Sequence, residues 1–151
     1  MVYVELEDIL EQTVADINSY SVSFIHGSIF DGNIDADETP YPLIIAEEIR
    51  ANGTTNITGG TIFTHTIRAY VLFKSELDDE PKSQRNAHKQ MCRKIIREWL
   101  SILSSADNIR EINSTATNYV KNQLDSNGDG YAVDITLRTR GELICYKRST
   151  N

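Results

Sequence analysis

Cysteine is scarce in this sequence of 151 residues, which contains two cysteines and no CxxC pair. Two cysteines cannot form the disulfide framework of a small secreted domain, and the sequence predicts no structural zinc site. Long apolar runs are also missing, because the longest uncharged one, 41–46, is far shorter than the about 20 residues that cross a bilayer. The N-terminus lacks the basic and apolar regions of a signal peptide. We therefore expect a soluble, intracellular protein that binds no membrane.

Motifs typical of enzymes are absent as well. No glycine-rich phosphate loop follows a predicted strand and opens a helix. The three histidines, His26, His65 and His88, are scattered, with no nucleophile or carboxylate paired with them locally. We therefore predict no catalytic residues and no cofactor, and we expect Cys92 and Cys145 to be buried free thiols. An enzyme whose site is assembled from distant residues stays open, and it would place His65 beside a carboxylate in a deep pocket.

Residues 125–130, DSNGDG, have the ligand spacing with which a calcium loop begins. Asp125, Asn127 and Asp129 would supply oxygens at its first, third and fifth positions. The twelfth position is Thr136, where such a loop requires a bidentate glutamate, and the flanking pattern is that of a strand. Because the ligand set is incomplete, the sequence predicts no metal site here. It predicts a tight turn between strands, since Asn-Gly and Asp-Gly pairs accept positive φ.

Charge is unevenly spread along the chain, whose net charge is −7. Residues 1–50 contain eleven acidic side chains and one basic side chain, a balance of −10, whereas residues 82–104 contain six basic and one acidic, a balance of +5. The acidic excess argues against general nucleic-acid binding, although the basic segment alone could face nucleic acid. The asymmetry is typical of a surface where copies of a protein meet, of a charged partner, or of two solvated helix faces of opposite sign.

Hydrophobic periodicity predicts two helices and several strands. Helices are expected over 3–18 and 82–104, and strands over 20–30, 41–50, 61–75, 131–140, 143–147 and, more weakly, within 109–124. A helix over 43–50 stays an alternative, because AEEIR contains good helix formers. The order predicts a single α+β domain over 1–151, in which an N-terminal helix and one long central helix pack on a mostly antiparallel β-sheet. Residues 147–151 are expected to be a frayed tail.

Three segments carry the clearest expected core. In 61–75, apolar residues occur on both faces between 67 and 73, which predicts a central strand covered on two sides or by a neighbouring subunit. In 131–140, Val133, Ile135 and Leu137 alternate with polar residues and are expected to point inward. In 82–104, the expected apolar stripe consists of Ala87, Met91, Cys92, Ile95, Ile96, Trp99, Ile102 and Leu103. Trp99 and Tyr70 are expected to be core anchors.

Residues 51–60, ANGTTNITGG, contain three of the eight glycines. Such a composition is typical of a flexible loop or a hairpin tip. A loop of this kind can order against a partner, and the contact candidates are then Asn52, Gly53, Thr54, Asn56 and Gly59. A plain surface hairpin is an equally compatible interpretation.

The order of these segments resembles the tail terminator proteins of long-tailed bacteriophages, also called tail completion or head-to-tail joining proteins. These are small acidic α+β proteins with an N-terminal helix, strands, one long helix and further strands. The corresponding parts here are LEDILEQTVADIN, SVSFIHGSIF, YPLIIAEEIR, TIFTHTIRAYVLFKS, SQRNAHKQMCRKIIREWLSIL and YAVDITLRTRGELICYK. The resemblance covers nearly the whole chain, and it lies in the layout of the elements.

The resemblance implies a virion protein, assembled in the host cytoplasm, that forms a homohexameric ring. The ring would cap the tail tube, dock on head-completion proteins and let DNA pass through its lumen. Ring contacts join two different surfaces, so the acidic and basic segments could pair between neighbours. The interface candidates are Glu7 and Glu11 with Arg85, Lys89, Arg93 and Arg97. The segment 51–60 could reach the tube or the connector.

Two other classes of function stay open beside this one. One is another phage neck or tail component, such as a head-closure protein or a tail-tube protein, and a tube protein would polymerise alone. The other is a small acidic binding or inhibitor module that acts as a monomer on a basic partner. Mass in solution separates the three, because they predict a closed ring, a filament and a monomer.

Overall fold

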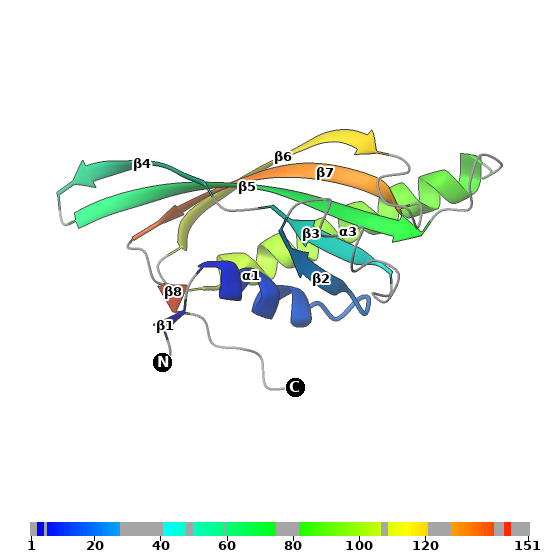
Figure 1. The fold of residues 1–151 in the computed structure, drawn as a ribbon, viewed down its shortest axis with the longest axis horizontal. Helices are drawn as coiled ribbons and strands as arrows, with labels where there is room; N and C mark the ends of the chain where they lie inside the picture. Colours follow the sequence, from blue (N-terminus) through cyan, green and yellow to red (C-terminus); the bar gives the residue numbers. More distant parts are fainter. Residues whose placement is uncertain are drawn as a thin grey trace.

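The computed structural model describes residues 3–4, 6–27, 41–47, 50–58, 60–74, 82–106, 109–120, 128–140 and 144–145. The helices in these ranges are α1 (Leu6–Ala15) and α3 (Lys82–Ser104) (Figure 1). The strands are β1 (Tyr3–Val4), β2 (Ser23–His26), β3 (Leu43–Ala46), β4 (Arg50–Ile57), β5 (Gly60–Lys74), β6 (Ile109–Val120), β7 (Gly128–Thr139) and β8 (Ile144–Cys145). Neither helix is long and apolar enough to cross a membrane.

The main sheet has six strands and is built around β5. Five strands follow the order β2-β3-β5-β7-β6, and β4 also pairs with β5. Along one edge, β5 pairs with β7 from Phe63 to Lys74; along the other, it pairs first with β4 and then, from Ala69 to Leu72, with β3. Only the pairing of β2 with β3 is parallel among these described strands. The predicted α+β fold with a mostly antiparallel sheet is confirmed.

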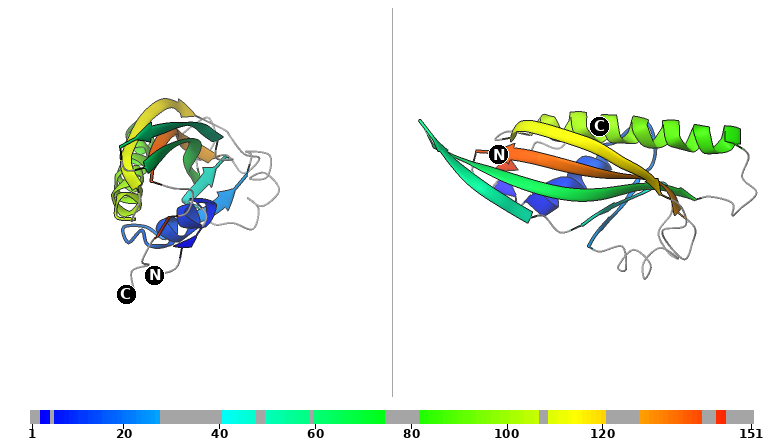
Figure 2. Two further views of the ribbon diagram at one scale, coloured as in Figure 1. Left: turned by 90° about the vertical axis from the view of Figure 1, so that its left-hand side faces the viewer. Right: turned by 90° about the horizontal axis from the view of Figure 1, so that it is seen from above.

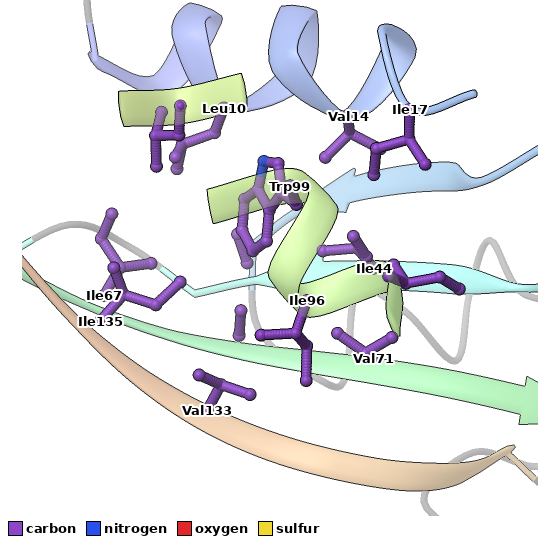
Figure 3. Packing of buried hydrophobic residues seen from close by; sticks show 14 of the residues in the cluster. Leu10, Val14, Ile17, Ile44, Ile67, Val71, Ile96, Trp99, Val133 and Ile135 are labelled. Carbon is purple, nitrogen blue, oxygen red and sulfur yellow. The ribbon is translucent and has the colours of Figure 1, made fainter. Parts of the chain in front are cut away.

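Both helices lie on one face of the sheet, where the main core forms (Figures 1 and 3). Trp99 lies at its centre, and Figure 3 shows its indole between α1 and the sheet. The predicted inward residues of 131–140 and most of the predicted stripe on α3 are buried, which confirms both patterns. Ala87 is an exception, because it is exposed on the first turns of α3.

A second, smaller core covers the opposite face of β5. It consists of Ile25, Leu43, Ile45 and Leu72, with Tyr41 and Tyr70 packed against it. Leu72 and Val71 are adjacent in β5, and both are fully buried, one on each face. The prediction of a central strand covered on two sides is therefore confirmed, and Tyr70 packs at the margin of this second core.

Several predicted element boundaries are wrong. The helix alternative over 43–50 is wrong, because Leu43–Ala46 is a strand. Its four residues are buried, and it pairs with β2 along one edge and with β5 along the other. The first helix is shorter than 3–18, since Tyr3–Val4 pairs with β8 instead. The weak strand signals in 109–124 belong to one continuous strand, β6.

The segment 51–60 is not the flexible loop that its composition predicts. Residues Arg50–Ile57 form β4 and pair with β5 down to Ile57 opposite Gly60, so only the two residues 58 and 59 connect the strands. Main-chain pairing with the long strand β5 overrides the turn preference of glycine and asparagine here. The hairpin part of the prediction is correct. The predicted frayed tail, 147–151, lies outside the described residues.

Candidate functional site

The three histidines have separate surroundings. His65 is buried in β5, where its Nε2 lies 3.1 Å from Oγ1 of Thr139. His88 on α3 stacks on Phe73, with ring centroids 5.7 Å apart, and His26 is exposed at the end of β2. The three histidines are therefore not gathered in one site, because His65 lies against a hydroxyl of β7 and His88 against an aromatic ring of β5.

The candidate calcium ligands are only partly covered by the described residues. Asp125 and Asn127 lie outside them, and Asp129 belongs to β7, opposite Phe73 of β5. The predicted turn is thus already an extended strand from Gly128 onward. Within the described ranges, no three His, Cys, Asp or Glu side chains are placed to hold a metal ion.

Cys92 is the buried free thiol that the sequence predicts. Its Sγ donates a hydrogen bond to the carbonyl oxygen of Val71 at 3.4 Å. Burial raises the pKa of this thiol to about 12, so the reactive thiolate is not populated near neutral pH. Cys145 lies in β8, paired with Tyr3 of β1.

The acidic candidates lie on the outer side of α1. Leu6, Ile9 and Leu10 are buried against the core, whereas Glu7, Asp8 and Glu11 are exposed. This division follows from the helical repeat, which places residues three and four apart on one face. We call Glu7, Asp8 and Glu11 the acidic surface. Glu7 and Asp8 occupy the first turn, where negative charge is favoured by the helix dipole.

The basic candidates form one stripe along α3. Arg85, Lys89, Arg93 and Arg97 follow each other at intervals of four residues, so they lie on neighbouring turns of one face. We call these four residues the basic stripe. Arg93 and Arg97 are exposed, while Arg85 and Lys89 are half-buried. Like charges at this spacing repel each other and weaken an isolated helix, so the stripe favours a partner of opposite charge.

One member of the stripe is already held within the subunit. Nη2 of Arg93 donates a hydrogen bond to the hydroxyl of Tyr131 at 3.2 Å, and its guanidinium lies 5.5 Å from the centroid of that ring. A cation over an aromatic face retains its positive charge while its position becomes fixed. Arg93 is therefore a positioned cation, and it is a poor choice for a charge-reversal test because its replacement also removes this contact.

The two ion pairs described for this structure lie in the sheet. Arg68 pairs with Asp134 at 2.9 Å, and Arg138 pairs with Glu111 at 3.3 Å. Both recorded pairs link neighbouring strands of the sheet. The hydrogen bonds from Arg68 hold the pKa of Asp134 below its usual range. On the helices, α1 presents exposed carboxylates to solvent, and α3 presents the exposed cations Arg93 and Arg97.

Glu98, the only acidic residue of 82–104, holds the chain just after α1. Its carboxylate accepts hydrogen bonds from the backbone N–H of Asn18 at 2.8 Å and of Ser19 at 3.4 Å, and from the Ser19 hydroxyl. These bonds, that from the Ser19 hydroxyl first, hold the pKa of Glu98 below its usual value of 4.5. Sequence reasoning missed this contact, although a lone acid in a basic helix is a signal that points to it. Glu98 thereby fixes the spacing of α1 from α3.

Replacing Glu98 with glutamine is expected to make stability less dependent on pH. Because the folded-state pKa is lowered, the carboxylate stabilises the fold above about pH 4.5, and this contribution is lost as the pH falls through the lower folded value. Urea unfolding between pH 3 and 7 should show wild type more stable than Glu98→Gln at neutral pH, with the difference shrinking in acid (roughly below pH 4.5). Glu47→Gln, a change of the same kind elsewhere, is the control. A difference that stays constant across the range contradicts the assignment.

The β4–β5 hairpin projects from the body of the molecule, as Figures 1 and 2 show. Pairing with β7 ends at Phe63 opposite Thr139, so the hairpin beyond that point consists of β4 and β5 alone among the described strands. The candidates Gly53, Thr54 and Asn56 are exposed there; Asn52 also lies in β4, and Gly59 is outside the described residues. Thr61 Oγ1 donates to Asn56 Oδ1 at 2.9 Å across the two strands.

The tip of the hairpin carries an apolar side chain in an otherwise polar setting. Ile57 is 42 % exposed, and it is the one large hydrophobic side chain that is exposed among those whose surroundings the structure describes. A hairpin that is well ordered by pairing, yet exposes all of Gly53–Ile57, is a suitable contact element for a partner. Comparison with family models and with curated proteins finds no match for this chain.

Proposed function

We propose that the protein is a phage tail terminator, a virion structural protein whose copies form a homohexameric ring that caps the tail tube and joins it to the head–neck complex. The element order of the α+β domain supports the proposal, because it corresponds to that of the tail terminators along nearly the whole chain. The residues described above supply surfaces suited to assembly, and this role requires no catalytic group.

The observation that carries the proposal is the presence of two exposed surfaces of opposite charge, one on each helix. A ring uses heterologous contacts, in which one patch of each subunit meets a different patch of the next. The acidic surface and the basic stripe are two such patches of opposite sign on one chain. Binding of the stripe by acids of the next subunit would also relieve the repulsion between its own like charges.

The remaining features fit the other contacts of such a ring. The projecting hairpin supplies a contact for the tail tube or the connector. DNA is passing cargo in the lumen, and an acidic protein with a net charge of −7 does not retain a polyanion. Partners are then further copies of the chain, tail-tube proteins and head-completion proteins, with the virion as the location.

Reversing charge on the stripe is expected to weaken the ring. The variant Arg85→Glu/Lys89→Glu/Arg97→Glu leaves Arg93 and its contact with Tyr131 in place. Each subunit contact should lose about 1–3 kcal/mol, since exposed pairs contribute about 0.2–1 kcal/mol each and attraction becomes repulsion. Size-exclusion chromatography with light scattering at several concentrations and salt levels measures the loss, which should diminish in high salt.

Two matched variants show whether the effect arises from the pairing. Lys74→Glu changes an exposed charge on the sheet and should leave assembly unchanged. Adding Glu7→Lys/Glu11→Lys to the triple variant makes the surface of α1 positive where the stripe of α3 has become negative. The attraction between neighbours then returns, so assembly should be restored. Unchanged hexamers for the triple variant on native mass spectrometry contradict the pairing. For wild type, electron microscopy separates the proposed ring from a filament, typical of a tube protein, and from a monomer, typical of a small binding module.

A further inference from the structure

Next to the projecting end of the hairpin, the sheet consists of four strands in the order β4-β5-β7-β6 (Figure 1). One row of residues crosses all four: Gly53 faces Thr64, Thr64 faces Arg138, and Arg138 faces Glu111. The β3 strand pairs with β5 only further along, from Ala69 onward. This part of the sheet therefore has β4 and β6 as its two outer strands, and Thr55–Ile57 of β4 extend beyond it.

Each outer strand has one described partner and one open edge. In the described ranges β4 pairs with β5 alone, and β6 pairs with β7 alone. Because all three pairings are antiparallel, β4 and β6 run in opposite directions. Copies can stand side by side around an axis inclined to the strands, so that each is displaced along the sheet edge and Glu111–Ala116 of β6 lies level with Gly53–Ile57 of β4. In this arrangement β6 of one copy is antiparallel to β4 of the next. Antiparallel pairing is slightly more stable than parallel pairing. It is possible here because the number of strands is even; with an odd number, the two outer strands would run in the same direction and could pair only in parallel.

The edge of β4 lacks the features that keep edge strands apart. Natural edge strands are protected by charged side chains, proline or bulges. Gly53–Ile57 contains no charged residue and no proline, and its pairing with β5 is regular, because the one register shift lies before Gly53. All five residues are exposed. The pairing of β6 with β7 shifts register between Ile109 and Glu111 and between Ala116 and Tyr119, so the regular stretch of β6 is Glu111–Ala116. Arg110 and Glu111 are exposed, and the uncharged β4 edge repels neither.

We propose that β4 of each subunit pairs through main-chain hydrogen bonds with β6 of a second copy, so that the sheet continues from one subunit to the next. The inference rests on the proposed ring and goes beyond it by naming the strands that meet. The contact is independent of the charged helices, which lie on one face of the sheet, whereas strand pairing joins its edges. It also covers Ile57 at the tip.

The register identifies the amides that take part. In a hairpin closed by two residues, the flanking pair Ile57 and Gly60 exchanges hydrogen bonds, and the pattern then alternates along the strand. Ile57, Thr55 and Gly53 thus bond to β5, and the N–H groups of Thr54 and Asn56 point to the open edge. Proline at an outward position removes that donor and is tolerated in an edge strand.

The variant Thr54→Pro/Asn56→Pro tests the proposal against Thr54→Ala/Asn56→Ala, which loses the same side chains and retains both N–H groups. The proline pair should raise the concentration for half-assembly about tenfold or more, while the alanine pair stays near wild type. Circular dichroism establishes that both are folded. Hydrogen exchange on wild type is the second measurement, and the amides of Thr54 and Asn56 should become protected on assembly.

A chemical cross-link identifies the strand that pairs with the outer edge of β4. In a Cys145→Ser background, Asn56→Cys with Asn113→Cys should give covalent multimers with a short bis-maleimide, whereas either single cysteine should not. Cys92 is buried and does not compete. Multimers from the double variant alone support pairing of β4 with β6, and their absence in an assembled ring overturns it.

The outcomes separate this inference from the proposed function. Rings that persist in the proline pair, with the amides of Thr54 and Asn56 exchanging freely, overturn strand pairing and leave the ring intact. Filaments with protected amides support strand pairing and overturn the terminator role. A wild-type chain that stays monomeric at every concentration overturns both.

Discussion

Replacing Trp99 with alanine is expected to lower the free energy of unfolding by about 3–5 kcal/mol, the range for large aromatic residues in a core. The side chain is fully buried between α1 and the sheet (Figure 3). Its Nε1 donates a hydrogen bond to Oγ1 of Thr13 at 2.9 Å, and that hydroxyl in turn lies 2.8 Å from the carbonyl oxygen of Ile9. Removal of the indole therefore leaves a cavity and a lost hydrogen bond at the contact of the two helices.

Urea unfolding followed by far-UV circular dichroism measures this loss, because the variant lacks the chain's only tryptophan and with it the fluorescence signal. Thr13→Val separates the hydrogen bond from the packing. It keeps the shape of Thr13 and leaves the buried Nε1 without its acceptor, at a cost of about 1–3 kcal/mol. Ser101→Ala, an exposed change on the same helix, should stay within about 0.5 kcal/mol of wild type. A loss below about 1 kcal/mol for Trp99→Ala contradicts the packing described here.

The strongest local patterns predicted the main elements of the fold. The apolar stripe on 82–104 predicted α3 and both of its ends correctly. The alternation of Val133, Ile135 and Leu137 predicted the inward face of β7. Apolar residues on both faces of 61–75 predicted the central position of β5. These elements were predictable because each shows its burial pattern within its own residues.

The segments that were mistaken depend on strands outside their own residues. Asn, Gly and Thr in 51–60 favour turns, and only the length of β5 converts them into a paired strand. Likewise, Leu43–Ala46 is a strand because β2 and β5 flank it, although AEEIR alone permits a helix. The features of the candidate surfaces also differ in how far the sequence predicts them. The negative charge of α1 and the positive charge of α3 follow from composition, whereas the Glu98 contacts and the open sheet edges appear only in three dimensions.

Gly130 is a further residue whose role changes with the structure. In the sequence, Gly130 is the last residue of the predicted turn 125–130, and the conformational freedom that a turn needs would account for a glycine there. In the structure it lies in β7 opposite Leu72 of β5, and its backbone packs directly on that strand. A Cβ atom at this position would lie 1.8 Å from the carbonyl oxygen of Val71 and 3.1 Å from Cα of Leu72. Glycine is therefore required for the close approach of two strands.

Gly130→Ala is accordingly expected to destabilise the fold by roughly 3 kcal/mol, the upper end of the range for overpacking. The obstructing atoms belong to the backbone, so no side chain can rotate away, and Val71 and Leu72 are fully buried on the two faces of β5. Thermal and urea unfolding measure the loss. Thr136→Ala, a half-buried change on the same strand that adds no atom, is the control.

The same substitution links the core to the proposed assembly. Since β7 joins β5 to β6, forcing β7 away from β5 displaces the edge of β6 relative to that of β4. Gly130→Ala should therefore weaken assembly even at temperatures where the subunit is still folded, and the light-scattering assay detects this. A variant with wild-type stability contradicts the close approach of β7 to β5. A folded but destabilised variant that assembles like wild type instead shows that the two sheet edges do not have to keep their relative position for the ring to form.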